Sequence, residues 1–226
     1  MCLLFSPAAA EVYVGSMDYI DNPATLDTDG NLANGWQTGF TIDWQVSNEG
    51  TGPAGYDWFY DYTINVPKFA PRRLIIEMAD SLTSANINTV KLYKNGSEDL
   101  TYSDWSVGLQ STAGNADMPE AVYGVLFDSI GTGTGNDEEV RLTFWSNISP
   151  GWGDFYSRCD GNGNRAFNLG FTTSDTDPTA PPSSGVNSNH ILTLVPEPSA
   201  AAQLLAGMAT LAPFGILYLI RRRRRP

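Results

Sequence analysis

Short runs of apolar, β-branched and aromatic residues, each bounded by turn signals, constrain the fold of this chain most strongly. About eight to ten such runs occur between residues 40 and 195. The clearest lie at residues 40–46, 56–66, 73–78, 89–94, 121–127, 139–145, 152–156, 166–171 and 190–195. Asn95-Gly96 follows the run 89–94 and is a strong hairpin signal, which predicts a return strand over residues 97–102. Because this region shows no long 3.6-residue period, we expect an all-β fold, a β-sandwich of which the jelly roll is one form.

Alternation of apolar and polar residues along these runs predicts one buried and one solvent-exposed face for each sheet. In the run 56–66, Trp58, Tyr60 and Tyr62 share one face, and Asp57 and Asp61 share the other. The acidic side chains indicate that the second face is wet, so we expect Trp58 and Tyr60 to lie in the core. The alternative is that such aromatic rings are exposed and stack on sugars, as in a carbohydrate-binding module.

The stretch 11–195 is strongly acidic. Of the 13 Lys and Arg residues, five lie at 221–225, and Glu197 is the only one of the 25 acids outside this stretch. The stretch therefore holds 8 basic and 24 acidic residues, a net charge of −16. Such a surface repels nucleic-acid phosphates and favours solubility and cation binding. We expect a single domain here, with no nucleic-acid partner.

The last 31 residues differ from the rest of the chain. Residues 200–220 carry no charge, and as a helix they would be about 31 Å long, close to the ~30 Å hydrocarbon core of a bilayer. Arg221, Arg222, Arg223, Arg224 and Arg225 follow them directly. Because loops rich in arginine stay cytoplasmic, this block predicts a membrane helix with the preceding domain on the far side of the membrane.

Val195-Pro196-Glu197-Pro198-Ser199, followed by this helix and the arginine block, closely resembles the PEP-CTERM sorting signal of Gram-negative bacteria. The resemblance covers residues 195–225 only. It implies that an exosortase-like membrane protease recognises and processes the motif Pro196, Glu197 and Pro198. It also implies an exported protein that the C-terminal helix anchors transiently in the inner membrane. Such proteins typically lie at the cell surface or in the matrix, in association with extracellular polysaccharide.

The N-terminus is consistent with export. Residues 1–10 end in Ala8-Ala9-Ala10, a small-residue pattern like that of a signal-peptide cleavage site. We expect these residues to be the remnant of a signal peptide, residues 11–195 to be the β-sandwich domain, and residues 196–226 to be the sorting signal. Cleavage after Ala10 would remove Cys2 and leave Cys159 alone, so no internal disulfide is expected.

One Asp/Asn cluster has the spacing of a metal-binding loop. Asp160, Asn162 and Asn164 alternate, and residues 27–31 contain a similar pattern. Calcium takes several oxygen ligands from flexible loops, so we consider Asp160, Asn162 and Asn164 as ligands of a structural Ca²⁺. The alternative is ordinary tight-turn chemistry, which uses the same residue types. No other cofactor is expected.

No catalytic residue can be assigned from a motif. Glu77 and Glu139 lie in strand-like runs without a surrounding signature, and the sole histidine, His190, has no recognisable cysteine-protease context for Cys159. We therefore expect a protein that is not an enzyme, with a structural or adhesive role in exopolysaccharide or biofilm. The alternatives are a carbohydrate-binding module and a hydrolase with unrecognised carboxylates.

Overall fold

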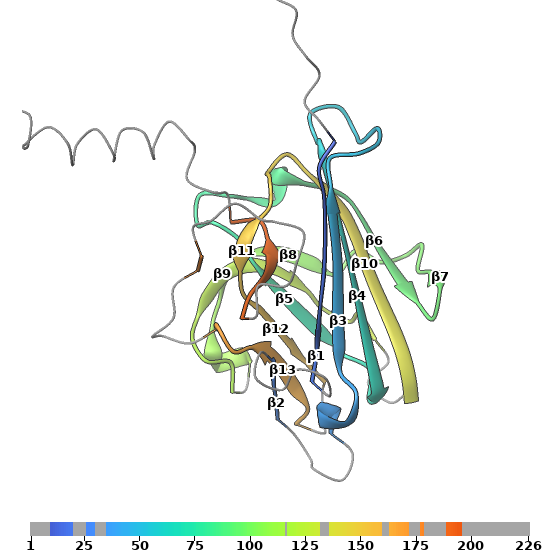
Figure 1. Cartoon of the computed structure of the whole chain (residues 1–226), viewed down its shortest axis with the longest axis vertical. Coiled ribbons are helices and arrows are strands. Elements are labelled where there is room, and N and C mark those ends of the chain that lie inside the picture. The colour runs from blue at the N-terminus through green and yellow to red at the C-terminus, as the bar shows by residue number, and fades with distance from the viewer. Residues whose placement is uncertain are drawn as a thin grey trace, which may run out of the picture.

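Two six-stranded antiparallel sheets and a two-stranded ribbon form the described part of the chain (Figure 1). This computed structural model describes residues 10–19, 26–29, 35–115, 117–131, 136–159, 163–171, 177–178 and 189–195. The first sheet has the spatial order β1 (Val12–Asp18), β3 (Thr41–Ser47), β4 (Trp58–Lys68), β10 (Asn136–Ser146), β6 (Ile87–Lys94) and β7 (Ser97–Glu98). The second has the order β2 (Leu26–Asp29), β13 (Arg165–Asn168), β12 (Phe155–Arg158), β5 (Arg73–Glu77), β9 (Val122–Phe127) and β8 (Trp105–Gln110).

The ribbon pairs β11 (Gly151–Gly153) with β14 (Ile191–Thr193). An isolated parallel bridge between Met78 and Leu194 ties β14 to the end of β5. The hydroxyl of Tyr62 on β4 donates to the carbonyl oxygen of Leu192 at 2.6 Å. The ribbon is therefore fastened both to the second sheet and to the inner face of the first.

Aromatic side chains fill the space between the sheets. Tyr60, Tyr62 and Phe144 are fully buried, and the ring centroids of Tyr60 and Phe144 lie 5.1 Å apart. Phe144 on β10 also stacks on Phe127 of β9 with a centroid distance of 5.8 Å, which joins the two sheets. The prediction that Tyr60 faces the core is confirmed. Trp58 is only partly buried and stacks on Tyr13 of β1.

The all-β architecture and the sandwich are confirmed. Three short 3-10 turns, η1 (Trp36–Thr38), η2 (Ser84–Asn86) and η3 (Thr112–Gly114), are the helical elements of the described ranges. The Asn95-Gly96 turn has φ angles of 49° and 76°, as a type I′ hairpin requires. Among the described residues there is no helix of the length and apolarity needed to cross a membrane. The predicted helix 200–220 lies outside them.

Three strands were not predicted, and one predicted run is divided. The missing strands are β1, β2 and β8, and the run 152–156 separates at Asp154 into β11 and β12. In β1 the apolar pattern is interrupted at Gly15, where a side chain would collide with the indole ring of Trp44. The sequence of β1 therefore reflects packing against a neighbouring strand and not alternation alone.

Candidate functional site

Asp154 lies where the chain leaves the ribbon and enters the second sheet. Its backbone N–H donates to Oε2 of Glu77 at 2.8 Å, and the backbone N–H of Glu77 donates to the carbonyl oxygen of Asp154 at 2.9 Å. Glu77 is the last residue of β5. This reciprocal pair holds the Glu77 carboxyl against the Asp154 backbone at the junction of three strands.

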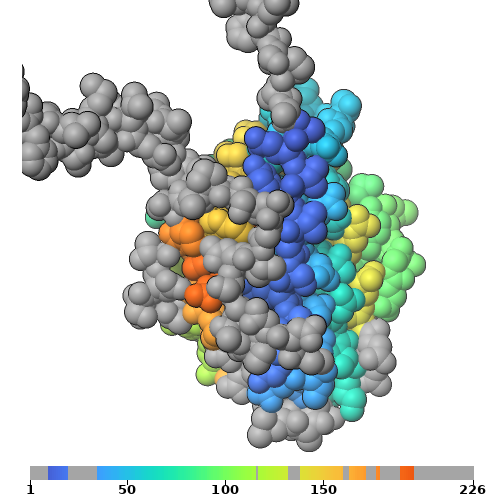
Figure 2. All heavy atoms as spheres, in the orientation of Figure 1, coloured from blue at the N-terminus to red at the C-terminus, as the bar shows by residue number. Residues whose placement is uncertain are grey.

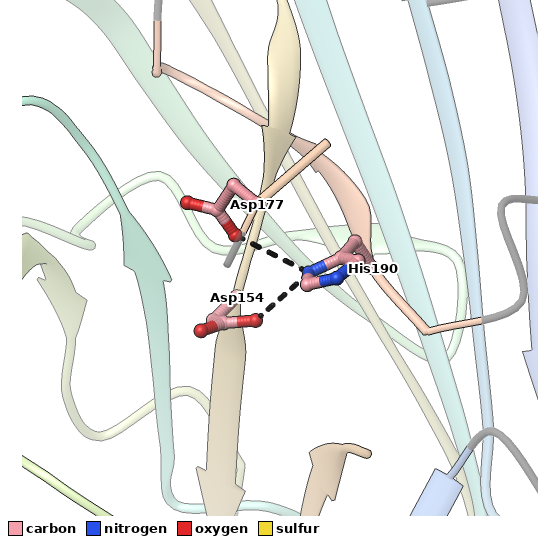
Figure 3. A group of neighbouring side chains, drawn as sticks. All are labelled: Asp154, Asp177 and His190. Atoms are coloured by element: carbon pink, nitrogen blue, oxygen red, sulfur yellow. Dashed lines mark hydrogen bonds and ion pairs between the residues drawn. The ribbon is translucent and has the colours of Figure 1, made fainter. Parts of the chain in front are cut away.

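Two carboxylates approach the same nitrogen of a buried histidine (Figure 3). Nδ1 of His190 lies 3.2 Å from Oδ1 of Asp154 and 3.3 Å from Oδ1 of Asp177. His190 precedes β14 and its side chain is only 3% exposed. The ligand-type atoms of these three residues all lie within 4.8 Å of one another. We call Asp154, Asp177 and His190 the carboxylate–imidazole cluster.

A buried amide fixes the orientation of the cluster. Nδ2 of Asn168 donates to Oδ1 of Asp154 and to the carbonyl oxygen of Asn189, each at 2.6 Å. Its Oδ1 accepts from the N–H of Phe155 at 2.8 Å, so the amide orientation is determined on both sides. On the other side, a side chain at Gly170 would collide with the imidazole ring of His190. The ring and the Asp154 carboxylate therefore have little freedom to move.

Burial changes the protonation of this group. Burial, together with the charges of Asp177 and Asp154, raises the pKa of Glu77 to about 8. Burial also raises the pKa of Asp154, although hydrogen bonds from His190 and Asn168 oppose this. Burial alone would lower the pKa of His190, but hydrogen bonds to Asp154 and Asp177 outweigh it and raise the pKa to about 9. At neutral pH the imidazole of His190 and the carboxyl group of Glu77 are therefore both protonated.

Thr193 adds a hydroxyl beside the same carboxyl group. A Cβ atom at Gly153 would collide with Oγ1 of Thr193 and lie 2.8 Å from Oε2 of Glu77, so both oxygens face the space beside Gly153. Thr193 is fully buried, and Oγ1 has no hydrogen-bond partner within the described part of the chain. Buried hydroxyls are usually hydrogen-bonded, so this oxygen is an exception that needs a reason.

A second group of candidate side chains lies on the outer face of the first sheet. Phe59 on β4 and Trp145 on β10 are half-buried, with ring centroids 5.0 Å apart. Next to them Arg141 makes a two-pronged contact with Asp61, with distances of 2.9 and 2.6 Å, and lies over the ring of Tyr93. Further along this face a shallow hollow of about 550 Å³ is lined by side chains of β1, β3 and β4, among them Val14, Ser16, Asp43, Gln45, Asp61 and Thr63. Figure 2 shows β1 along one margin of this sheet and the β6–β7 hairpin at the opposite margin.

The structure describes only one of the site residues predicted from the sequence. Pro196, Glu197, Pro198, the five arginines, Asp160 and Asn162 lie outside the described residues. Asn164 is 1% exposed, and neither atom of its side-chain amide has a hydrogen-bond partner among the described residues. The pairing of β2 with β13 sets Asp29 opposite Arg165. Calcium binding there stays a prediction.

The carboxylate–imidazole cluster was not predicted from the sequence. Asp154 and Asp177 carry no motif, and His190 was considered only as a partner for Cys159. Cys159 is buried at 2% exposure and is not a member of the cluster. The only available signal was a single histidine at the start of a strand-like run in an acidic chain. That signal does not identify its partners, because they lie 13 and 36 residues away.

No protein-family model and no curated protein matches this chain. A likeness exists to the crystal structure of the KRT10-binding region domain of the pneumococcal serine rich repeat protein PsrP. It covers 71% of this chain and 88% of that chain, with 13% sequence identity and a TM-score of 0.25. A likeness at this TM-score supports no inference about the fold or the function of this chain.

Proposed function

We propose that this protein is an exported β-sandwich protein of the cell surface or extracellular matrix, with a structural or adhesive role in exopolysaccharide or biofilm. The observation that carries the proposal is the order of motif, uncharged 21-residue segment and arginine block at residues 196–225. An exosortase-like membrane protease would process the Pro196-Glu197-Pro198 motif. The membrane helix 200–220, transient anchoring in the inner membrane and the jelly-roll form of the sandwich belong to this proposal.

The junction between the sandwich and the motif supports a removable tail. The last described backbone hydrogen bonds of the sandwich involve Leu194, the residue after β14. Its N–H donates to the carbonyl oxygen of Glu77, and its carbonyl oxygen accepts from the N–H of Ala79. Pro196 begins only two residues later. Cleavage within the motif would therefore leave every described hydrogen bond of the sandwich in place.

Deletion of Pro196–Pro198 tests the sorting step. We expect the deletion variant to stay in the inner-membrane fraction with its tail attached, whereas Ser199→Ala, which leaves the motif intact, should be sorted like the wild type. Cell fractionation and the mass of the recovered protein report both properties. Sorting of the deletion variant to the same compartment with the same processed mass would refute the role of the motif.

The second candidate function is carbohydrate binding on the outer face of the first sheet. The half-buried Phe59 and Trp145 rings, with Asp61, Arg141 and the neighbouring hollow, favour it because sugars stack on aromatic rings and hydrogen-bond to polar groups. A glycan array that includes the host exopolysaccharide tests it. Binding by the wild type that is lost in Trp145→Ala supports this function, and no binding to any polysaccharide contradicts it.

A further inference from the structure

We propose that Asp154, Asp177 and His190 form a binding site for one divalent transition-metal ion of the zinc class, independently of how the protein is sorted. These three residues come from the β11–β12 junction, the segment between β13 and β14, and the position directly before β14. A bound ion would join these segments at the place where the ribbon meets the second sheet. Its role in this chain would be a structural cross-link.

The geometry of the cluster fits metal ligation. Ligands about 2.0–2.1 Å from a tetrahedral zinc ion lie roughly 3.3 Å from one another. Nδ1 of His190 lies 3.2 and 3.3 Å from the two aspartate oxygens. An imidazole nitrogen carries at most one proton, which can point at only one acceptor with good geometry. A cation bound by the three residues would replace the Nδ1 proton for which the two carboxylate oxygens otherwise compete.

A buried oxygen without a partner gives an independent indication of a missing ligand. Oγ1 of Thr193, in a fully buried residue, faces the space beside Gly153 together with Oε2 of Glu77 and lacks a hydrogen-bond partner among the described residues. That space adjoins Asp154, because Oε2 of Glu77 accepts from the Asp154 N–H. A metal-bound water in that space would satisfy the Thr193 hydroxyl. Glu77 is not one of the three ligands, but its Oε2 borders the same space.

The surrounding residues resemble the support that metal ligands usually have. Ligating carboxylates are normally held by hydrogen bonds from a second layer of residues. Mutation of these supporting residues lowers metal affinity about 10–100-fold. Asn168 donates to Oδ1 of Asp154 and is itself held by Phe155 and Asn189. The mixture of one imidazole and two carboxylates suits zinc-class ions, whereas calcium prefers ligands that are all oxygen.

Metal titration of the full chain, purified in detergent and stripped with a chelator, tests the site. We expect one Zn²⁺ per chain by elemental analysis, weaker binding of Ca²⁺, and a rise in Tm of about 5–10 °C at a hundredfold excess of Zn²⁺ over Kd. Since His190 is the only histidine of the chain, its ¹⁵N signal should report ligation directly. Asp177→Asn should weaken Zn²⁺ binding at least about tenfold without unfolding the apo-protein, because the Asp177 side chain is 29% exposed.

Asp99→Asn is the matched control, because its side chain is 28% exposed and it lies beyond the β6–β7 hairpin. It should bind Zn²⁺ like the wild type. The proposal is overturned if the wild type binds no zinc, if Asp177→Asn binds it equally well, or if the His190 signal does not respond to zinc. Tighter binding of Ca²⁺ than of Zn²⁺ would overturn the assigned ion class.

Discussion

The aromatic core between the sheets and the polar site beside the ribbon are buried in the same sandwich but organised in opposite ways. In the core, Tyr60, Tyr62 and Phe144 stack on one another, and apolar contact is the main interaction. At the ribbon, Glu77 and the carboxylate–imidazole cluster bring three carboxyl groups and one imidazole together in a largely buried place. Burial stabilises the first region. In the second region, burial of charged groups is unfavourable, and hydrogen bonds, bound protons or a cation must offset that cost. The core is therefore stable by itself, whereas the ribbon site depends on its protonation or on a bound ion.

The largest expected effect comes from opening a cavity in the core. Phe144→Ala removes a fully buried ring that contacts Tyr60 and Phe127 on opposite sheets. Large-to-small substitutions of this kind cost about 3–5 kcal/mol. Denaturant unfolding should show this loss, and Phe59→Ala, on the half-buried outer face, should cost clearly less. Equal losses in the two variants would contradict the assignment of the core.

The next effect is the pH dependence of the metal-free ribbon site. The pKa of Glu77 is about 8 in the folded state, against about 4.3 in an unfolded chain. The folded state therefore holds more protons between these values, and its stability falls as the pH rises through this window. His190, with a folded pKa of about 9 and an unfolded value near 6.5, stabilises the fold below pH ~6.5 and loses this contribution as the pH rises toward 9.

Both titrations thus act in the same direction. With chelator present, the free energy of unfolding should fall by about 1–3 kcal/mol between pH 5 and pH 9, after allowance for the partial exposure of Glu77. Glu77→Gln cannot ionise and should flatten part of this slope. Urea unfolding at several pH values measures it. A stability that rises with pH, or an unchanged slope in Glu77→Gln, would show that the site is not charged as described.

A smaller loss is expected when the space beside Gly153 is filled. Gly153→Ala would place a methyl group against Oγ1 of Thr193 and Oε2 of Glu77. Overpacking of a buried position costs about 1–3 kcal/mol. We expect a loss near the lower end of this range, because the Glu77 side chain is flexible and can move away from the added methyl group. Thermal unfolding provides the measurement, with Gly114→Ala as the control because no atom lies within 4 Å of a Cβ there. If both variants unfold at the same temperature, the described contact is wrong.

The smallest effect belongs to the outer face. Asp61→Asn breaks the ion pair with Arg141, whose side chain is 43% exposed, and should cost only about 0.5 kcal/mol because water screens such pairs. The effect should shrink further in high salt. Double-mutant cycles with Arg141→Gln measure the coupling. A coupling of several kcal/mol would contradict the screening of this ion pair by water.

Local sequence patterns predicted the core but not the ribbon site. Alternation placed Tyr60 correctly, and Asn95-Gly96 specified its hairpin, because both depend on neighbouring residues only. β1 was not predicted because Gly15 interrupts its apolar pattern. A glycine is needed there because the Trp44 ring on the next strand leaves no room for a side chain. The ribbon site depends on the pairing of β12 with β5 and of β11 with β14, which brings together Glu77, Asp154 and His190. The spacing of these three residues in the sequence does not indicate that they lie close together in the fold.

The intact mass of the protein recovered from the cell surface or medium decides whether the tail is removed, because it reports both ends of the mature chain. We expect a chain that begins at Glu11 and ends within Pro196–Pro198, without the uncharged segment and the arginine block. A mature protein at the same location that still carries residues 200–226 would contradict it.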